Sequence, residues 1–183
     1  MVERILEGAL NVFKKKGPKF TMDDIASEMK MSKKTIYTVF NDKNELMCAM
    51  VDYTFDLIKE AEDRVYNDNT LSTVDKLRSI LVVLPEKYYA YDFSAMQVLA
   101  AKYPKAYQML KERLESGWDK TFDLLKKGME EGSVREISLP VFKLMYESSI
   151  ERILVGDFLK ENNMRYPEAL ENMASVLIDG ILV

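Results

Sequence analysis

An all-α fold is the fold class that the sequence predicts, and three observations predict it. Apolar residues recur three and four positions apart along nearly the whole chain, which is the spacing of one helix face. Glycine and proline, which interrupt helices, number only 7 and 5 among 183 residues. No segment shows the alternation of apolar and polar residues that is typical of a half-buried strand.

The first predicted helix covers residues 2–16. It ends in three consecutive lysines, which suit the negative end of a helix dipole, and Gly17 and Pro18 then stop it. One face of this helix carries apolar side chains at positions i, i+3, i+4, i+7, i+8 and i+11, namely Val2, Ile5, Leu6, Ala9, Leu10 and Phe13.

Three further helix starts follow within a short stretch, each with a side chain suited to cap it. Thr21 has Asp24 three residues later, which is a capping-box pattern, and Asp42 has Glu45 in the same relation. Ser32 begins a short helix in which Ile36 and Phe40 are predicted to point inward. The helix after Asp42 is predicted to continue to about residue 66.

Two short helices joined by a tight turn and packed on a preceding helix form a helix-turn-helix, whose second helix presents its outer face to the DNA major groove. The residues at this face have suitable chemistry, because lysines reach phosphates or guanine edges, threonines contact thymine methyls or phosphates, and a tyrosine hydroxyl bonds to phosphate. Helix N-termini also favour anions. The predicted DNA contacts are Thr21, Lys33, Lys34, Thr35, Tyr37, Thr38 and Lys43.

Simpler interpretations of these residues exist. Lysines on exposed helix faces are usually only solvated, and Tyr37 could be a core tyrosine with a wet hydroxyl. The charge distribution favours a nucleic-acid partner only weakly: residues 1–50 hold nine Lys and Arg against seven Asp and Glu, whereas the whole chain has 26 against 30.

The segment "ERILEGALNVFKKKGPKFTMDDIASEMKMSKKTIYTVFNDKNELM" resembles the N-terminal domain of TetR/AcrR-type bacterial transcriptional regulators. The resemblance implies a three-helix DNA-binding domain, residues 1–46, joined by a long fourth helix to a helical ligand-binding and dimerisation domain, residues 47–183. It also implies a homodimer that binds double-stranded DNA and leaves it when a small molecule binds. Lys30 departs from the family, which commonly has glycine there, and a left-handed backbone at Lys30 would cost about 1 kcal/mol. Basic residues ahead of the first helix, which family members often carry, are missing as well.

Beyond the fourth helix, we expect helices near residues 71–90, 93–102, 104–131, 139–161 and 166–182. The last carries a wide apolar stripe, and the helix before it has a ridge of Met145, Ser149, Arg152 and Gly156. Both could be buried within one chain. The resemblance favours the other interpretation, a homodimer through the last two helices.

Aromatic and methionine side chains concentrate between Tyr88 and Tyr146. Such residues at helical spacing are often core, but they also line small-molecule sites among helices. We therefore expect an apolar or aromatic effector and place its site at Phe93, Met96, Trp118, Phe122 and Tyr146.

Composition excludes several functional classes. The chain has no histidine, so Ser-His-Asp and Cys-His catalysis and histidine-bound zinc are excluded. We predict no catalytic residue, no metal site and no cofactor. No run of eighteen apolar residues predicts a membrane span, and the single cysteine, Cys48, fits a reducing cytosol. We therefore expect a cytoplasmic protein with no membrane partner.

The predicted function is a ligand-responsive transcriptional regulator, a repressor that a small molecule releases from a palindromic operator. Two alternatives remain open at this point. The chain could be a helical protein-interaction module without DNA binding, or an enzyme that uses Asp and Glu pairs, although no paired motif stands out.

Overall fold

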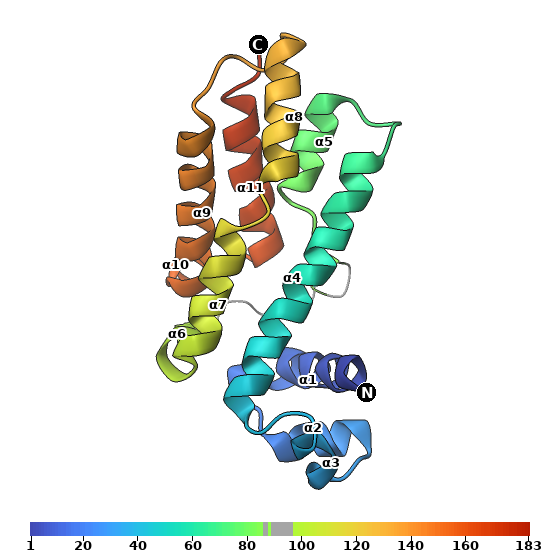
Figure 1. Ribbon diagram of the computed structural model, residues 1–183. Helices are drawn as coiled ribbons and strands as arrows, with labels where there is room; N and C mark the ends of the chain where they lie inside the picture. The colour runs from blue at the N-terminus through green and yellow to red at the C-terminus, as the bar shows by residue number, and fades with distance from the viewer. Residues whose placement is uncertain (86–87, 89–96) are drawn as a thin grey trace.

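The computed structural model describes residues 1–85, 88 and 97–183, and the described elements are helices (Figure 1). Within these ranges the only strand-like pairing is an isolated bridge between Val134 and Leu182, and no helix is long and apolar enough to cross a membrane. The elements in chain order are α1 (Val2–Lys16), the 3-10 helix η1 (Gly17–Lys19), α2 (Met22–Met29), α3 (Lys33–Tyr37), α4 (Lys43–Asn67), α5 (Thr73–Ile80), α6 (Gln97–Lys102), α7 (Pro104–Glu115), α8 (Asp119–Glu130), α9 (Leu139–Val155), α10 (Phe158–Glu161) and α11 (Tyr166–Asp179).

Helices α1, α2 and α3 gather at one end of the molecule, where the first turns of α4 pack on them (Figure 1). The predicted apolar face of α1 is buried from Ile5 to Phe13, whereas Val2 is exposed. Ile36 and Phe40 point inward as predicted, and Ile36 is fully buried. The short α3 is therefore fixed by its buried side, and its other side is left to solvent.

All three predicted caps are confirmed. The Thr21 hydroxyl accepts a hydrogen bond from the Asp24 N–H, and the Asp24 carboxylate accepts one from the Thr21 N–H, which completes a capping box. The Ser32 hydroxyl accepts from the Thr35 N–H, and the Asp42 carboxylate accepts from the N–H of Glu45. These bonds satisfy N–H groups that the helices cannot pair themselves.

Helix α4 carries the chain from this end to the other half of the molecule over 25 residues. A tyrosine ties it to α1, since the Tyr53 hydroxyl lies 3.4 Å from a carboxylate oxygen of Glu3 and 3.3 Å from one of Glu7. Burial and these two carboxylates raise the pKa of Tyr53 to about 12.

The other half is a bundle of α5, α8, α9 and α11 around a core that includes Leu77, Leu125 and Ile178, each fully buried. The single helix predicted over 104–131 is wrong, because the structure divides it into α7 and α8. The division occurs at Gly117, whose φ of 71° is left-handed, after an extended Ser116 whose hydroxyl donates to the carbonyl of Arg113.

The helix predicted over 139–161 is also divided, at Gly156. A Cβ there would lie 2.6 Å from the Arg152 carbonyl oxygen, so glycine lets the chain turn between α9 and α10. The helix predicted over 71–90 ends at Ile80, well before Pro85. The described part of the helix predicted over 93–102 begins at Gln97.

The apolar stripe of α11 is buried or half-buried within the chain, and its members pack against the core of this bundle or the core at the α1 end. The exposed apolar residues lie elsewhere. Val141, Leu144 and Met145 on α9 are 52%, 62% and 51% exposed, and Val176 on α11 is 75% exposed. The α11 stripe is therefore buried within one chain, which is the alternative interpretation given above. Met145, on the predicted ridge of α9, is exposed instead.

Candidate nucleic-acid interface and internal cavity

The solvent-facing side of α3 carries mainly polar side chains, and the buried side of the helix fixes its position. Lys33, Lys34 and Thr38 are exposed, Thr35 is half-buried, and Tyr37 is 42% exposed. The interpretation of Tyr37 as a core residue is therefore wrong. Because Ile36 is held in the core, these side chains keep a fixed position relative to α1 and α2, and a rigid element holds binding groups more precisely than a loop.

Lys33 already has a partner, since its ammonium donates to the Asp23 carboxylate at 2.7 Å. This hydrogen bond raises the pKa of Lys33, so the side chain is a stable cation. Both groups are exposed, and an exposed ion pair is worth only about 0.2–1 kcal/mol. A phosphate could therefore draw Lys33 from Asp23 at little cost.

The threonine hydroxyls make hydrogen bonds within the helix-turn-helix, and these bonds still allow them to contact DNA. The Thr35 hydroxyl lies 2.8 Å from the Ser32 hydroxyl, and the Thr38 hydroxyl donates to the Thr35 carbonyl at 2.7 Å. The exposed Thr21 hydroxyl accepts one bond in its capping box, and a hydroxyl that accepts can still donate to an anion.

Lys43 differs from the other predicted contacts, because its ammonium is turned toward the protein. It donates to the Pro18 carbonyl at 3.0 Å and to the Phe20 carbonyl, lies 4.0 Å from the centre of the Phe20 ring, and is 5.1 Å from that of Tyr103. These contacts join the α1–α2 connection to the start of α4 and the start of α7. A Lys43 substitution therefore tests packing as well as any phosphate contact.

The turn between α2 and α3 depends on Lys30, which has φ 50° and ψ 43°. The expected left-handed backbone is present, and the residue that adopts it is not glycine. The strain of about 1 kcal/mol falls on the turn that sets the angle between the two helices of the motif.

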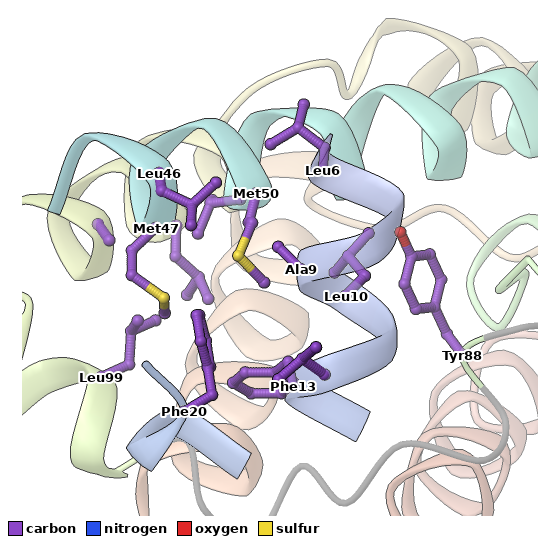
Figure 2. Packing of buried hydrophobic residues seen from close by; sticks show 14 of the residues in the cluster. Leu6, Ala9, Leu10, Phe13, Phe20, Leu46, Met47, Met50, Tyr88 and Leu99 are labelled. Carbon is purple, nitrogen blue, oxygen red and sulfur yellow. The ribbon is translucent and has the colours of Figure 1, made fainter. Parts of the chain in front are cut away.

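An internal cavity of about 170 Å³ lies behind this motif and continues into the C-terminal half. Eight of its lining residues are on one side of α4, from Met47 to Glu62, and the rest come from α1, α5 to α9 and α11 and from the segments joining them. Figure 2 shows several of these lining residues, with Leu10 of α1 on the side of Tyr88, and Leu99 next to Met47 of α4.

Polar groups cluster at one part of this lining. Lys59 donates to Glu62 at 2.8 Å and to the Gly117 carbonyl at 3.2 Å. The Arg113 guanidinium bonds to Asp56 at 2.5 Å, but its buried Nε has no hydrogen-bond partner among the described residues. Buried donors without a partner are uncommon in folded proteins.

The predicted effector residues are partly brought together. Trp118 and Tyr146 line the cavity, with ring centres 5.3 Å apart. Phe122 contacts Trp118, with ring centres 5.8 Å apart and ring planes tilted by 38°, but it is not among the lining residues. The Tyr146 hydroxyl donates to the Leu81 carbonyl at 2.6 Å, and burial raises its pKa well above the usual range, so it stays neutral. Phe93 and Met96 lie outside the described residues.

The sequence prediction missed the α1 part of the wall. Leu10 and Phe13 sit on the apolar face of α1 and were assigned only to its core. Helical spacing identifies which face of α1 is buried, but it does not say that a cavity lies against that face.

Comparison with known proteins agrees with this architecture. The model of the family "Bacterial regulatory proteins, tetR family" matches residues 5–50. The uncharacterized HTH-type transcriptional regulator YvaF of Bacillus subtilis (strain 168) is 26% identical over 181 residues, which are 99% of this chain and 95% of that protein.

Solved structures share the fold over almost the whole chain. A TetR transcription regulator from Haloarcula marismortui ATCC 43049 has a TM-score of 0.74 at 17% identity, covering 100% of this chain and 98% of its own. The regulatory protein TetR from Rhodobacter sphaeroides has 0.75 at 15%, covering 98% of both chains. The transcriptional regulator FadR from Bacillus subtilis, solved in complex with stearoyl-CoA, has 0.66 at 15%, covering 99% and 100%. The helix-turn-helix at one end thus matches the tetR family model over residues 5–50, and the whole chain is similar in sequence to a transcriptional regulator and in fold to solved regulators of the TetR family.

Proposed function

We propose that the protein is a homodimeric repressor that binds a palindromic operator through α3 and leaves it when an apolar small molecule fills the internal cavity. The observation that carries this proposal is the outer side of α3, where Lys33, Lys34, Tyr37 and Thr38 are exposed while Ile36 is fully buried. That division is what a recognition helix needs, because one side must fix its position while the other reaches DNA.

The exposed apolar residues of α9 and α11 support the dimer. Val141, Leu144, Met145 and Val176 are each at least half exposed on neighbouring helices that pack on each other. Exposed apolar residues grouped in this way mark interaction surfaces, and a two-fold axis through them would place a second copy on the same patch. We call these four residues the α9–α11 patch. A dimer would carry the two heads that a palindrome requires.

The cavity supports control by a ligand. It is lined mainly by apolar and aromatic side chains with a few polar groups, which is typical of small-molecule sites. One structural neighbour, FadR of Bacillus subtilis, was solved with stearoyl-CoA, so the fold accommodates a ligand with a long apolar part. A ligand releases DNA only if it binds more tightly to a form whose head spacing does not fit the operator.

The DNA-binding part of the proposal is tested by measuring affinity for the DNA upstream of the protein's own coding region. Lys34→Ala and Tyr37→Ala should each weaken binding about tenfold, since each removes a contact to phosphate or base worth about 1.5 kcal/mol. Lys34→Ala should also reduce the slope of log affinity against log salt by about 1. Fluorescence anisotropy of labelled DNA between 50 and about 200 mM salt measures both quantities.

The matched control is Lys126→Ala, which removes another exposed lysine, on α8 in the other half of the molecule. It should leave affinity and salt slope unchanged. If Lys126→Ala and Lys34→Ala behave alike, α3 is not the DNA-contacting surface, and the interpretation as a protein-interaction module gains support.

A further inference from the structure

Among the described residues, the charged side chains that line the internal cavity are each paired with an opposite charge. The Lys59 ammonium bonds at 2.8 Å to Glu62, which also lines the cavity. The Arg113 guanidinium bonds to the Asp56 carboxylate at 2.5 Å and lies 3.8 Å from that of Asp52. A charged ligand would lose its water on entering this mainly apolar space and would find no unpaired opposite charge there. The lining therefore favours a ligand without net charge.

Aromatic side chains supply a large part of the apolar lining. The Tyr146 hydroxyl donates to the Leu81 carbonyl at 2.6 Å, and the Trp118 indole donates to the Leu114 carbonyl at 3.0 Å. These polar atoms are therefore bonded within the protein, and the two side chains offer a ligand mainly ring surface. Rings pack favourably edge to face or with an offset on another aromatic ring. The described lining contains six aromatic residues, namely Phe13, Phe55, Tyr88, Trp118, Tyr146 and Tyr166.

The volume of the cavity limits the size of the ligand to about one ring. It is about 170 Å³, and an apolar cavity of ~150 Å³ in another protein holds one benzene molecule. One ring with a small substituent fits such a volume, whereas two fused rings or a long acyl chain exceed it. Stearoyl-CoA, with which the FadR neighbour was solved, is therefore too large for this cavity.

Arg113 also offers the cavity a hydrogen-bond donor. Its Nε is buried and has no hydrogen-bond partner among the described residues, while the other guanidinium nitrogens face Asp52 and Asp56. The oxygen of an alcohol or of an aldehyde accepts a hydrogen bond without carrying a charge. A ligand oxygen of this kind would satisfy the Nε donor and keep the site neutral.

We propose that the cavity binds an uncharged compound with a single aromatic ring and a small substituent whose oxygen accepts a hydrogen bond from Nε of Arg113. Simple aromatic alcohols and aldehydes belong to this class. The inference rests on the proposed function, because it takes the cavity as the effector site and names the kind of molecule that fits it. The paired charges determine that the ligand is neutral, the lining rings favour an aromatic ligand, and the volume determines its size.

Isothermal titration calorimetry of the unaltered protein with matched small molecules tests the class. Benzyl alcohol should bind. Benzylamine has the same non-hydrogen framework but is a cation at neutral pH, so it should bind at least about tenfold more weakly. Cyclohexylmethanol keeps the size and the oxygen but lacks the aromatic ring, and it should bind about threefold more weakly or worse. Naphthalenemethanol, which is too large, and palmitic acid, which is both too large and charged, should not bind.

Arg113→Lys tests the hydrogen bond separately from the fold. It keeps a cation for Asp52 and Asp56 and removes the Nε donor. Benzyl alcohol should therefore bind about fivefold more weakly, while the affinity for toluene, which has no oxygen, should change less than about twofold. A purely structural effect of the substitution would weaken the binding of both compounds alike.

A second pair of variants locates the binding site. Val51→Phe adds a ring to the lining of the cavity and should abolish the binding of benzyl alcohol and toluene. Val2→Phe adds the same ring at an exposed position on α1 and should leave both affinities unchanged. If Val51→Phe binds both compounds as the unaltered protein does, the ligand lies outside the cavity and the proposal is wrong.

The other outcomes are equally decisive. Equal affinity for benzyl alcohol and benzylamine would overturn the neutral class, and tighter binding of palmitic acid or naphthalenemethanol than of benzyl alcohol would overturn the limit of one ring. Absence of binding by benzyl alcohol would overturn the proposal as a whole. The comparison of compounds uses the unaltered protein, so it decides the matter even if a variant does not fold. None of these measurements involves DNA, whereas the proposed function would fail separately if the protein without ligand did not bind its upstream DNA.

Discussion

At the scale of single residues, several charged side chains near the DNA-binding end make contacts within the protein that stabilise its fold. Lys43 is the clearest case, since its ammonium bonds to two backbone carbonyls between α1 and α2 and lies near the ring of Tyr103. A hydrogen bond from a charged group contributes about 1.5–3 kcal/mol. Lost DNA affinity after a Lys43 substitution would therefore not by itself identify a phosphate contact, whereas Lys34 gives a cleaner test.

The ionisation of Asp24 makes the stability of the folded protein depend on pH. The hydrogen bond from Lys16 and the one from the Thr21 backbone lower the pKa of Asp24 from 3.8 to about 2. The folded state therefore favours the carboxylate, and this contribution is complete above the unfolded pKa of 3.8 and is lost as pH falls through about 2. Asp24→Asn should lower the free energy of unfolding near neutral pH.

The pH profile distinguishes this mechanism from a general loss of packing. The difference in unfolding free energy between Asp24→Asn and the unaltered protein, measured by urea denaturation, should stay constant from pH 5 to 8 and shrink below about pH 4. A difference that persists unchanged at pH 2 would mean that the Asp24 charge has no part in the effect.

At the scale of elements, the sequence predicts local features better than distant ones. The caps at Thr21, Ser32 and Asp42 are recognisable because a cap and the N–H it satisfies are only three residues apart. The breaks at Gly117 and Gly156 were missed, since a glycine within an apolar helical pattern is compatible with a continuous helix. Which side of α9 and α11 stays exposed depends on how the bundle packs, and periodicity alone does not contain that information.

The α1 wall of the cavity was unpredictable for the same reason. Buried residues on α1 look alike in sequence whether they contact other side chains or an internal space. The outer face of α3 was predictable, in contrast, because the two capped helices and the spacing between them already determine which side Ile36 buries.

The turn between α2 and α3 offers a test of strain at this scale. Lys30 adopts a left-handed backbone, which costs a residue with a side chain about 1 kcal/mol or more. Lys30→Gly should therefore raise the free energy of unfolding by about 0.5–1 kcal/mol after allowing for the greater freedom of glycine in the unfolded chain.

Lys30→Ala is the matched control, because it removes the same charge and keeps the strain. Thermal or urea unfolding of the two variants isolates the backbone effect, and their DNA affinities, compared at one salt concentration, show what the charge of Lys30 contributes. Equal stability of the two variants would mean that the turn relaxes, so that no strain is held there.

At the scale of the whole molecule, the two halves share one cavity and one long helix. The cavity contacts α1 at one end of α4 and α8 near the other, and the α9–α11 patch lies on the half away from α3 (Figure 1). In the proposed dimer, filling of the cavity would alter the position of each head relative to the contact between the two copies. Two heads read neighbouring half-sites only about 34–36 Å apart, so a modest displacement of either would forfeit one half-site.

The dimer proposal makes a prediction at this scale that Leu144 tests. Leu144 is 62% exposed in the single chain and belongs to the α9–α11 patch. In a two-fold interface Leu144→Glu would bury two unpaired carboxylates, and each would cost about 3–5 kcal/mol. Sedimentation should give a mass of two 21.2 kDa chains for the unaltered protein and of one chain for the variant.

Val2→Glu makes the same kind of change at another exposed residue, on α1, and should leave the mass at two chains. Leu144→Glu should also lose most of its affinity for a two-half-site operator while keeping its weak affinity for one half-site, because the head on α3 is untouched. A variant that still sediments as two chains would place the contact between copies on some other surface.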